Sequence, residues 1–417
     1  MFEAAVVDSN IILTRKLKSL NISIPSIDLS NEINIVDFSI YNDSFVNIEP
    51  KIDDVWSISS KAEQSLKLKF DKKGTPLKDW DLKFNRGILT GYNDAFIIDN
   101  ATKESLIHSD NTNIHLIKPI LAGKDIQRYK IDFNNLYIIT TFPSLKIEID
   151  SFPTLKNYFK NFGKKIYQIG EHYINEIGVK DKTRKKTSNK WFETQDTISY
   201  HKEYSLPKIF YREISDDMNA VYTEHEIYTN NKAYIITGES LKYLCCFLNS
   251  KLFNKMVLSQ TSNLGGKGEA FMKEVSVPKI NYDDQIPFIE KADIMLTLNK
   301  DLQEKNNKFT KYLQSQFAIE KLSKKLENWY ELSFAEFIKE LNKAIKETNK
   351  ERLKNNLQPI KELTKLDEMD WMDVFETKKT EAQNLQQQIN TTDKEIDAMV
   401  YELYGLSEEE IKIVEES

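Results

Sequence analysis

A Gly-containing segment between two apolar runs offers the first candidate for chemistry. Residues 84–99 read Phe-Asn-Arg-Gly-Ile-Leu-Thr-Gly-Tyr-Asn-Asp-Ala-Phe-Ile-Ile-Asp, which predicts two strands joined by a tight turn with positive φ. Backbone amides and polar side chains at such a turn can approach a phosphate or a base edge. A purely structural hairpin explains the same pattern. The candidate DNA-contacting side chains are Arg86, Thr90, Tyr92 and Asn93.

Basic charge is concentrated in residues 160–190. This window has nine basic and three acidic residues, a net charge of +6, whereas the whole chain carries −6. Aromatic residues follow it directly, and a basic segment beside aromatic side chains suits phosphate neutralisation with contact to bases or sugars. A solvated charged loop would look similar. The candidate contacts are Lys164, Lys165, Lys182, Arg184, Lys185, Lys186, Lys190 and Trp191.

Three further cations extend this candidate site. Lys124 lies in residues 117–129, where apolar and basic residues are interleaved, and Arg212 ends the predicted strand at 208–213. Lys267 lies in Leu-Gly-Gly-Lys-Gly at 264–268. That segment lacks the Gly-x-x-x-x-Gly-Lys-Ser/Thr order of a nucleotide-binding loop, so a loop touching a DNA phosphate is the preferred interpretation.

Motifs for catalysis are missing from the sequence. It contains no Asn-Pro-Pro or Asp-Pro-Pro followed by an aromatic residue, and no Gly-x-Gly strand-turn-helix for a nucleotide-like cofactor. The five histidines are scattered without the spacing of a zinc site. Cys245 and Cys246 lie in an apolar run and are predicted to be core residues. We therefore expect no catalytic residue, bound cofactor or metal in this chain.

The pattern of elements predicts an α+β protein. Short apolar runs separated by turn residues indicate a largely antiparallel β-rich part, with strands including 136–141, 208–213 and 233–237 and a helix at 241–256. Beyond residue 284, Lys, Glu, Leu and Gln dominate and predict long amphipathic helices. The helices are expected at 286–316, 317–329, 334–355, 370–390 and 392–403. The predicted domains are a β-rich remnant or adaptor at 1–55, with strands at 1–16 and 31–39, a recognition domain at 56–283 and a helical spacer or docking domain at 284–417.

Composition narrows the cellular setting. The apolar fraction of 40% is that of a folded protein, and no apolar run approaches the length of a membrane-spanning helix. The N-terminus lacks the pattern of a signal peptide. Two adjacent cysteines cannot form a disulfide framework, and a reducing compartment fits them. We expect a soluble cytoplasmic protein without a membrane partner.

Several stretches in this order resemble the C-terminal target-recognition region of type IIG restriction-modification enzymes and related adenine-specific DNA methyltransferases. The similarity begins near Trp56, covers nearly all of the chain after it and rests on the segments 84–99, 118–126, 208–214, 248–251, 320–345 and 396–411. The resemblance implies a β-rich recognition domain followed by helices similar to the spacer of type I specificity subunits. It also implies that residues 6–13 are the last strands of a methyltransferase domain.

The leading hypothesis is sequence-specific recognition of double-stranded DNA, with catalysis and S-adenosylmethionine binding carried by an associated methyltransferase domain or subunit. The chain lacks the catalytic part of the full-length pattern, so it is either a piece of a longer protein or a separate specificity subunit. A half-length type I specificity subunit that self-associates through its C-terminal helices is one alternative. A helical protein-interaction scaffold without DNA specificity is another.

Overall fold

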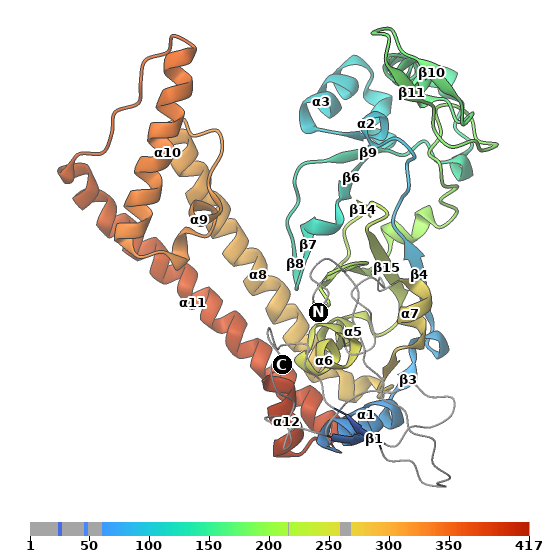
Figure 1. Cartoon of the computed structure of the whole chain (residues 1–417), viewed down its shortest axis with the longest axis vertical. Coiled ribbons are helices and arrows are strands. Elements are labelled where there is room, and N and C mark those ends of the chain that lie inside the picture. Colours follow the sequence, from blue (N-terminus) through green and yellow to red (C-terminus); the bar gives the residue numbers. More distant parts are fainter. Residues whose placement is uncertain (1–23, 27–45, 49–60, 216, 259–267, 417) are drawn as a thin grey trace.

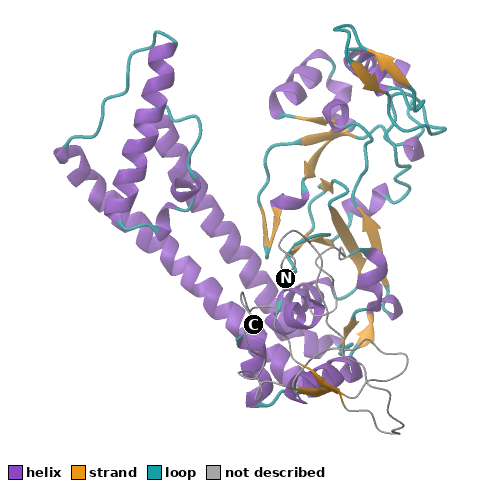
Figure 2. Ribbon diagram, viewed as in Figure 1, coloured by secondary structure: helices purple, strands orange, loops and turns teal. Residues whose placement is uncertain are grey.

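The computed structural model describes residues 24–26, 46–48, 61–215, 217–258 and 268–416. Figure 1 shows a β-rich part and an arm of long helices that meet at one end and diverge toward the other. The predicted α+β class is confirmed, since most strands precede the long helices (Figure 2). The strands predicted at 1–16 and 31–39 lie outside the described residues. Within the described part, no helix combines the length and apolarity needed to cross a lipid bilayer.

The central sheet is antiparallel and has the strand order β13-β12-β15-β4. Its strands are β4 (Leu82–Arg86), β12 (Lys208–Arg212), β13 (Ala220–Thr223) and β15 (Ala233–Gly238). One face, with Ile209 and Tyr211, packs on the core that contains helix α5 (Leu241–Asn249). Phe210 on the other face belongs to a second core. Because both faces are covered, β12 is apolar without the alternation of a half-exposed strand.

A second sheet supports the distal lobe, which we define as residues 89–200. Its order is β14-β6-β9-β5, with β5 (Ile97–Ile98), β6 (Ile117–Leu121), β9 (Tyr137–Ile139) and β14 (Tyr228–Thr229). Strand β14 is parallel to β6, and the other pairs are antiparallel. Helices α2 (Asn93–Phe96), α3 (Asn100–Ser109) and α4 (Pro153–Lys160) surround the third core. That core buries Phe96, Leu155 and Phe159.

Short paired strands complete the β-rich part. They are β1 (Ile24–Ser26) with β2 (Val46–Ile48), β3 (Thr75–Pro76) with β16 (Ser276–Val277), β7 (Ile126–Gln127) with β8 (Lys130–Ile131), and β10 (His172–Ile174) with β11 (Lys180–Lys182). The helix expected at 241–256 divides into α5 and α6 (Lys251–Leu258). Extended backbone at Ser250 separates the two helices. Helix α7 (Glu269–Glu274) precedes β16.

The hairpin predicted at 84–99 is wrong. Strands β4 and β5 belong to different sheets, and the short helix α2 lies between them. The reason is tertiary: the Gly87 N–H donates to the Ala233 carbonyl, and a Cβ at Gly87 would lie 1.9 Å from the Asn230 carbonyl oxygen. This close backbone approach carries the chain across to the second sheet. Of the two glycines, Gly91 alone has positive φ, at +79°.

The helical arm consists of α8 (Tyr282–Phe317), α9 (Lys324–Glu327), α10 (Phe334–Lys354) and α11 (Lys365–Tyr404). Capping side chains define its helix starts, as at Ser333, whose hydroxyl accepts from the Glu336 N–H. The two helices predicted at 370–390 and 392–403 are one continuous helix, α11, because no glycine or proline interrupts it. Gly405, with φ of +62°, then ends α11 before α12 (Glu408–Glu415).

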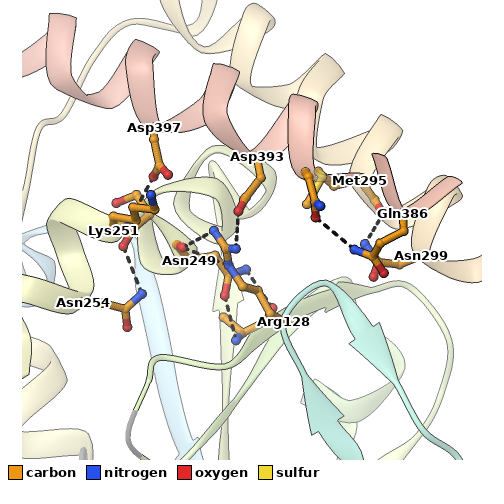
Figure 3. A network of polar contacts seen from close by, with 12 residues as sticks. Arg128, Asn249, Lys251, Asn254, Met295, Asn299, Gln386, Asp393 and Asp397 are labelled. Carbon is orange, nitrogen blue, oxygen red and sulfur yellow. Dashed lines mark hydrogen bonds and ion pairs between the residues drawn. The ribbon is translucent and has the colours of Figure 1, made fainter. Parts of the chain in front are cut away.

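Polar contacts join the arm to the β-rich part (Figure 3). Arg128 donates from Nε and Nη2 to the Asn249 carbonyl oxygen at 3.1 and 2.7 Å, and its Nη1 pairs with Asp393 of α11. Asp397, one turn further on, accepts the Lys251 N–H at 2.9 Å and so caps α6. Apolar packing also joins the two parts, since Phe70 of α1 (Lys61–Lys73) stacks on Tyr404 of α11 with 5.4 Å between ring centroids. The arm therefore shares one core with the central sheet.

Candidate nucleic-acid interface

A two-stranded hairpin projects from the distal lobe in the middle of the basic window. We call residues 172–182 the basic finger; Figure 1 places its strands, β10 and β11, at the end of the molecule far from α12. Its pairing is antiparallel, with His172 opposite Lys182, Tyr173 opposite Asp181 and Ile174 opposite Lys180. Because side chains directly opposite each other share a face, this register divides the finger into two faces of different character.

The inner face of the basic finger holds it on the lobe. The Tyr173 hydroxyl donates to Asp181 at 3.4 Å, and Lys165 pairs with the same carboxylate at 3.5 Å. Lys165 also lies over the ring of Tyr92, 5.2 Å from its centroid. Tyr92 in turn packs edge-on against Phe162 at 5.6 Å. Lys165 and Tyr92 therefore serve as the support of the finger.

The outer face is exposed and cationic. Lys180 and Lys182 are exposed on the finger, Lys185 and Lys186 follow it, and Lys164 is exposed beside it. None of these five lysines forms an ion pair with a carboxylate in the described part of the chain. Five ammonium groups without counter-charges on one lobe create a local positive potential that the net charge of −6 conceals.

Arg184, in contrast, is buried and organises the lobe. Its Nε donates to the Ile166 carbonyl at 2.7 Å, and its Nη1 donates to Thr90 and Glu193 carbonyls at 3.0 and 2.8 Å. Its Nη2 donates to the Trp191 carbonyl at 2.6 Å. Burial lowers the pKa of Arg184 to about 10, so the guanidinium stays protonated at neutral pH. The structure thus gives Arg184 an architectural role instead of the predicted phosphate contact.

The Gly91 turn is the point to which Arg184 attaches. Thr90 is buried, and its hydroxyl donates to Asn93 Oδ1 at 2.7 Å, which leaves Asn93 as the exposed member of the pair. A Cβ at Gly91 would lie 2.9 Å from Gln195 Oε1 and 3.3 Å from Arg184 Cδ. The predicted DNA contact of Thr90 is therefore corrected to a structural role, because its side chain faces the interior.

Arg86, Lys190 and Trp191 each contact a neighbouring side chain. Arg86 is exposed but lies 3.3 Å from the carboxylate of Glu213, and its carbonyl accepts from the Tyr200 hydroxyl. Lys190 pairs with Glu148 at 3.3 Å. Trp191 stacks on Tyr167 with 5.9 Å between ring centroids. Lys190 and Trp191 lie on the lobe, whereas Arg86 ends β4 of the central sheet; the ion pairs of Arg86 and Lys190 are exposed enough to exchange for a phosphate.

Lys124 and Arg212 lie together at a separate place. Arg212 donates to the carbonyls of Ile126 at 2.6 Å and Lys124 at 2.8 Å. They line a surface cavity of about 180 Å³ together with Lys232, a cation that the sequence analysis missed. Lys267 lies outside the described residues. The predicted site thus separates into the finger with its support, this cavity and the Arg86 region.

Two outer-face members of the finger were not predicted as DNA contacts. Lys180 was counted in the basic window but was not selected, and His172 opposite Lys182 was passed over. The signal was present in Asn175-Glu176-Ile177-Gly178, an Asn-x-x-Gly turn between two segments of equal length. Among the described residues, no group of three His, Cys, Asp or Glu side chains forms a metal site.

Two models of known protein families match parts of this chain. Residues 118–273 match the TaqI-like C-terminal specificity domain. The matched range contains the basic finger, Arg184 and the cavity at Arg212, and it confirms the resemblance read from the sequence. Residues 281–400, which span α8 to most of α11, match a domain of unknown function, DUF8810.

Two solved structures are similar to parts of this chain. The type IIL restriction-modification enzyme MmeI, solved in complex with DNA, is 11% identical with a TM-score of 0.37, covering 62% of this chain and 32% of the enzyme. The type IIG restriction endonuclease BpuSI is 13% identical with a TM-score of 0.34, covering 56% of this chain and 27% of the enzyme. This chain therefore spans only about a third of either enzyme. No curated protein matches it.

Proposed function

We propose that this chain recognises a specific sequence in double-stranded DNA, as the specificity part of a restriction-modification adenine methyltransferase. The observation that carries the proposal is the specificity-domain match over residues 118–273, within which the five unpaired lysines lie on or beside one finger. Catalysis and S-adenosylmethionine binding are assigned to a methyltransferase domain or subunit that acts with this chain. The proposal gives no catalytic step to the residues described above.

The charges of the lobe support a phosphate-binding role. Lys180, Lys182, Lys185 and Lys186 are consecutive exposed cations along one strand and its extension. In an extended strand, residues advance about 3.3 Å each, so this row is roughly 20 Å long and spans several phosphates of a duplex. Released counterions make such contacts favourable and salt-dependent. Base reading then falls to polar side chains beside the row, such as Asn93.

The helical arm is proposed as the spacer and docking element. Several of its lysines pair across or along helices, as Lys305 does with Glu381 at 2.8 Å. Acidic residues outnumber basic ones in residues 282–404, so the arm is less suited than the basic window to bind a phosphate backbone. The shared core and the Arg128–Asp393 pair fix where the arm leaves the sheet. A methyltransferase domain held by the arm would then be placed at a defined distance from the finger.

The test replaces Lys180, Lys182, Lys185 and Lys186 together by alanine and leaves Arg184 intact. We expect weaker binding to all duplexes and a slope of log K against log salt that is smaller by up to about 3.6, because each lost phosphate contact contributes about 0.9. Fluorescence anisotropy across a salt series measures both. The matched control replaces four exposed lysines of α10: Lys343, Lys346, Lys350 and Lys354.

An unchanged salt slope in the finger variant would refute the phosphate assignment. Equal losses in the finger and α10 variants would mean that binding follows net charge alone. Self-association measured by light scattering, without any DNA affinity, would favour the scaffold alternative. Co-purification as a dimer with a methyltransferase subunit would favour the half-length type I specificity subunit.

A further inference from the structure

The tip of the basic finger is apolar although its stem is cationic. Ile177 at the turn is 82% exposed, and Ile174 and Val179 on either side are 65% and 54% exposed. Exposed aliphatic side chains occur singly on most protein surfaces, but three adjacent ones at the end of a projection mark a contact surface. Lys180 and Lys182 lie directly behind them. The finger therefore has an apolar tip on a cationic stem.

The turn holds Ile177 at the apex in a fixed conformation. The Gly178 N–H donates to the Asn175 carbonyl, and the Asn175 N–H donates to the Val179 carbonyl, both at 2.9 Å. The Asn175 side chain accepts the Val179 N–H at 2.8 Å. Gly178 has φ of +79°, the conformation that glycine adopts without strain. The apex is therefore a closed turn, and Ile177 loses little backbone entropy when it binds.

The base of the finger is equally well supported. The Glu171 N–H donates to Thr183 Oγ1 at 2.8 Å, and the Gly170 N–H donates to the Arg184 carbonyl at 2.9 Å. Arg184 itself is anchored to three other segments of the lobe. The Tyr173, Asp181 and Lys165 contacts brace the inner face. These contacts hold the finger rigidly on the packed lobe.

We propose that the basic finger is a DNA wedge: Ile177 inserts between neighbouring base pairs, flanked by Ile174 and Val179, while Lys180 and Lys182 hold adjacent phosphates. Apolar wedges of this kind unstack a base step and bend the duplex, and the cost of unstacking is offset by the contacts that the bend permits. Pyrimidine–purine steps unstack most readily, so the wedge also contributes sequence preference without base hydrogen bonds. This inference rests on the proposed DNA binding.

Duplex DNA is favoured over a protein as the occupant by the charges around the tip. The exposed groups on the outer face of the stem are His172, Lys180 and Lys182, and the inner-face carboxylate of Asp181 is held by Lys165. Glu176 is the one acidic side chain in the turn itself. An apolar point carried on cations complements a stack of bases between two rows of phosphates.

The experiment uses the full chain and a duplex recovered from a random library by selection with that chain. 2-Aminopurine is placed at each position in turn, because its fluorescence rises when it unstacks, and end-to-end energy transfer reports bending. We expect one step to unstack on binding and the bend to appear with it. Ile177→Ser should abolish both signals and weaken binding about tenfold, with the salt slope unchanged because no phosphate contact is lost.

Two variants control this result. Ile177→Leu keeps an apolar wedge and should retain the fluorescence rise and the bend. Leu68→Ser, on α1, removes an aliphatic side chain that is 69% exposed and lies far from the finger, and should change nothing. Circular dichroism checks that each variant is folded, as expected for substitutions at exposed positions.

Failure of the wedge and failure of the proposed function give different results. If Ile177→Ser binds with wild-type affinity, fluorescence and bend, the wedge is refuted while DNA recognition stands. If the wild-type chain selects and binds no duplex, the proposed function fails and the wedge with it. If Ile177→Ser instead converts an oligomer into a monomer and leaves the DNA signals intact, the tip is a protein contact and the wedge is again refuted.

Discussion

The helical arm carries more acidic than basic residues and several of its lysines pair with carboxylates, whereas five lysines on and beside the basic finger have no ion-pair partner among the described residues. In the arm, Lys291 pairs with Glu395 at 2.6 Å, and Lys305 and Lys378 share Glu381 at 2.8 and 2.9 Å. In the lobe, Lys180 and Lys182 lie exposed without such partners among the described residues. Unpaired surface cations add little to folding stability, so the net positive charge of residues 160–190 indicates a ligand.

Two arginines of the β-rich part also differ in how their charge is compensated. Arg184 in the lobe is satisfied by four neutral carbonyls, so its charge remains uncompensated within the hydrogen-bonded set. Arg128, where the arm meets the β-rich part, contacts one carbonyl and the carboxylate of Asp393. Arg184 therefore adds to the positive charge of the lobe, whereas Asp393 neutralises the charge of Arg128. Three experiments test how far this difference in charge pairing governs stability.

The largest effect is expected from Arg184→Ala. Removing the guanidinium takes a hydrogen-bond donor from four carbonyls, two of which, at Thr90 and Glu193, keep a second donor, and it disconnects the segments at Thr90, Ile166 and Trp191. We expect a loss of about 4 kcal/mol in the free energy of unfolding of the lobe. Urea denaturation followed by tryptophan fluorescence measures it. The neighbouring Lys185→Ala removes an exposed cation and should stay within about 0.5 kcal/mol; equal losses would contradict the architectural role.

A smaller and pH-dependent effect on stability is expected at Asp397, where α11 meets the β-rich part. Burial raises the pKa of Asp397 to about 6, with Asp393 adding to the rise and Lys251 and Arg128 opposing it. Because the folded pKa lies above the ordinary 3.8, the protonated carboxyl contributes stability below about pH 4 that is lost as pH rises through about 6. The loss should be at most about 3 kcal/mol.

Asp397→Asn isolates this carboxyl, because the amide oxygen can still accept the Lys251 N–H. The stability of the wild-type chain relative to the variant should fall between about pH 4 and pH 6 and be level above that range. Thermal unfolding at a series of pH values gives the comparison. A difference that does not vary with pH would mean that Asp397 does not titrate in this range.

The smallest effect is expected for an ion pair of the arm. Lys291 and Glu395 are partly exposed, so their pair should contribute about 0.5 kcal/mol and weaken with added salt. A double-mutant cycle with Lys291→Ala and Glu395→Ala measures the coupling free energy by urea denaturation. A coupling above about 1.5 kcal/mol would show that pairing in the arm is a main source of its stability, and the contrast with the lobe would then be sharper.

Patterns with a local cause were predictable from the sequence alone. The long helices follow from the scarcity of Gly and Pro together with helix-forming residues. The structure joins 370–390 and 392–403 into α11, and it replaces most of the helix predicted at 317–329 by the short α9, because α8 ends at the left-handed Ala318. The strands at 208–213 and 233–237 match β12 and β15 closely. Cys245 and Cys246 are buried, as predicted, and burial raises their pKa values. The concentration of basic charge is a property of composition and needed no fold.

Tertiary structure decided which of those charges are available and what the Gly91 segment does. The sequence cannot distinguish Arg184 from Lys185, yet the register between β10 and β11 and the carbonyls of three distant segments bury the first and expose the second. The 84–99 segment was predicted to be a hairpin because local turn preferences ignore the approach of Asn230 to Gly87. Long-range backbone pairing outweighs such preferences, since each buried N–H and carbonyl must find a partner somewhere in the fold.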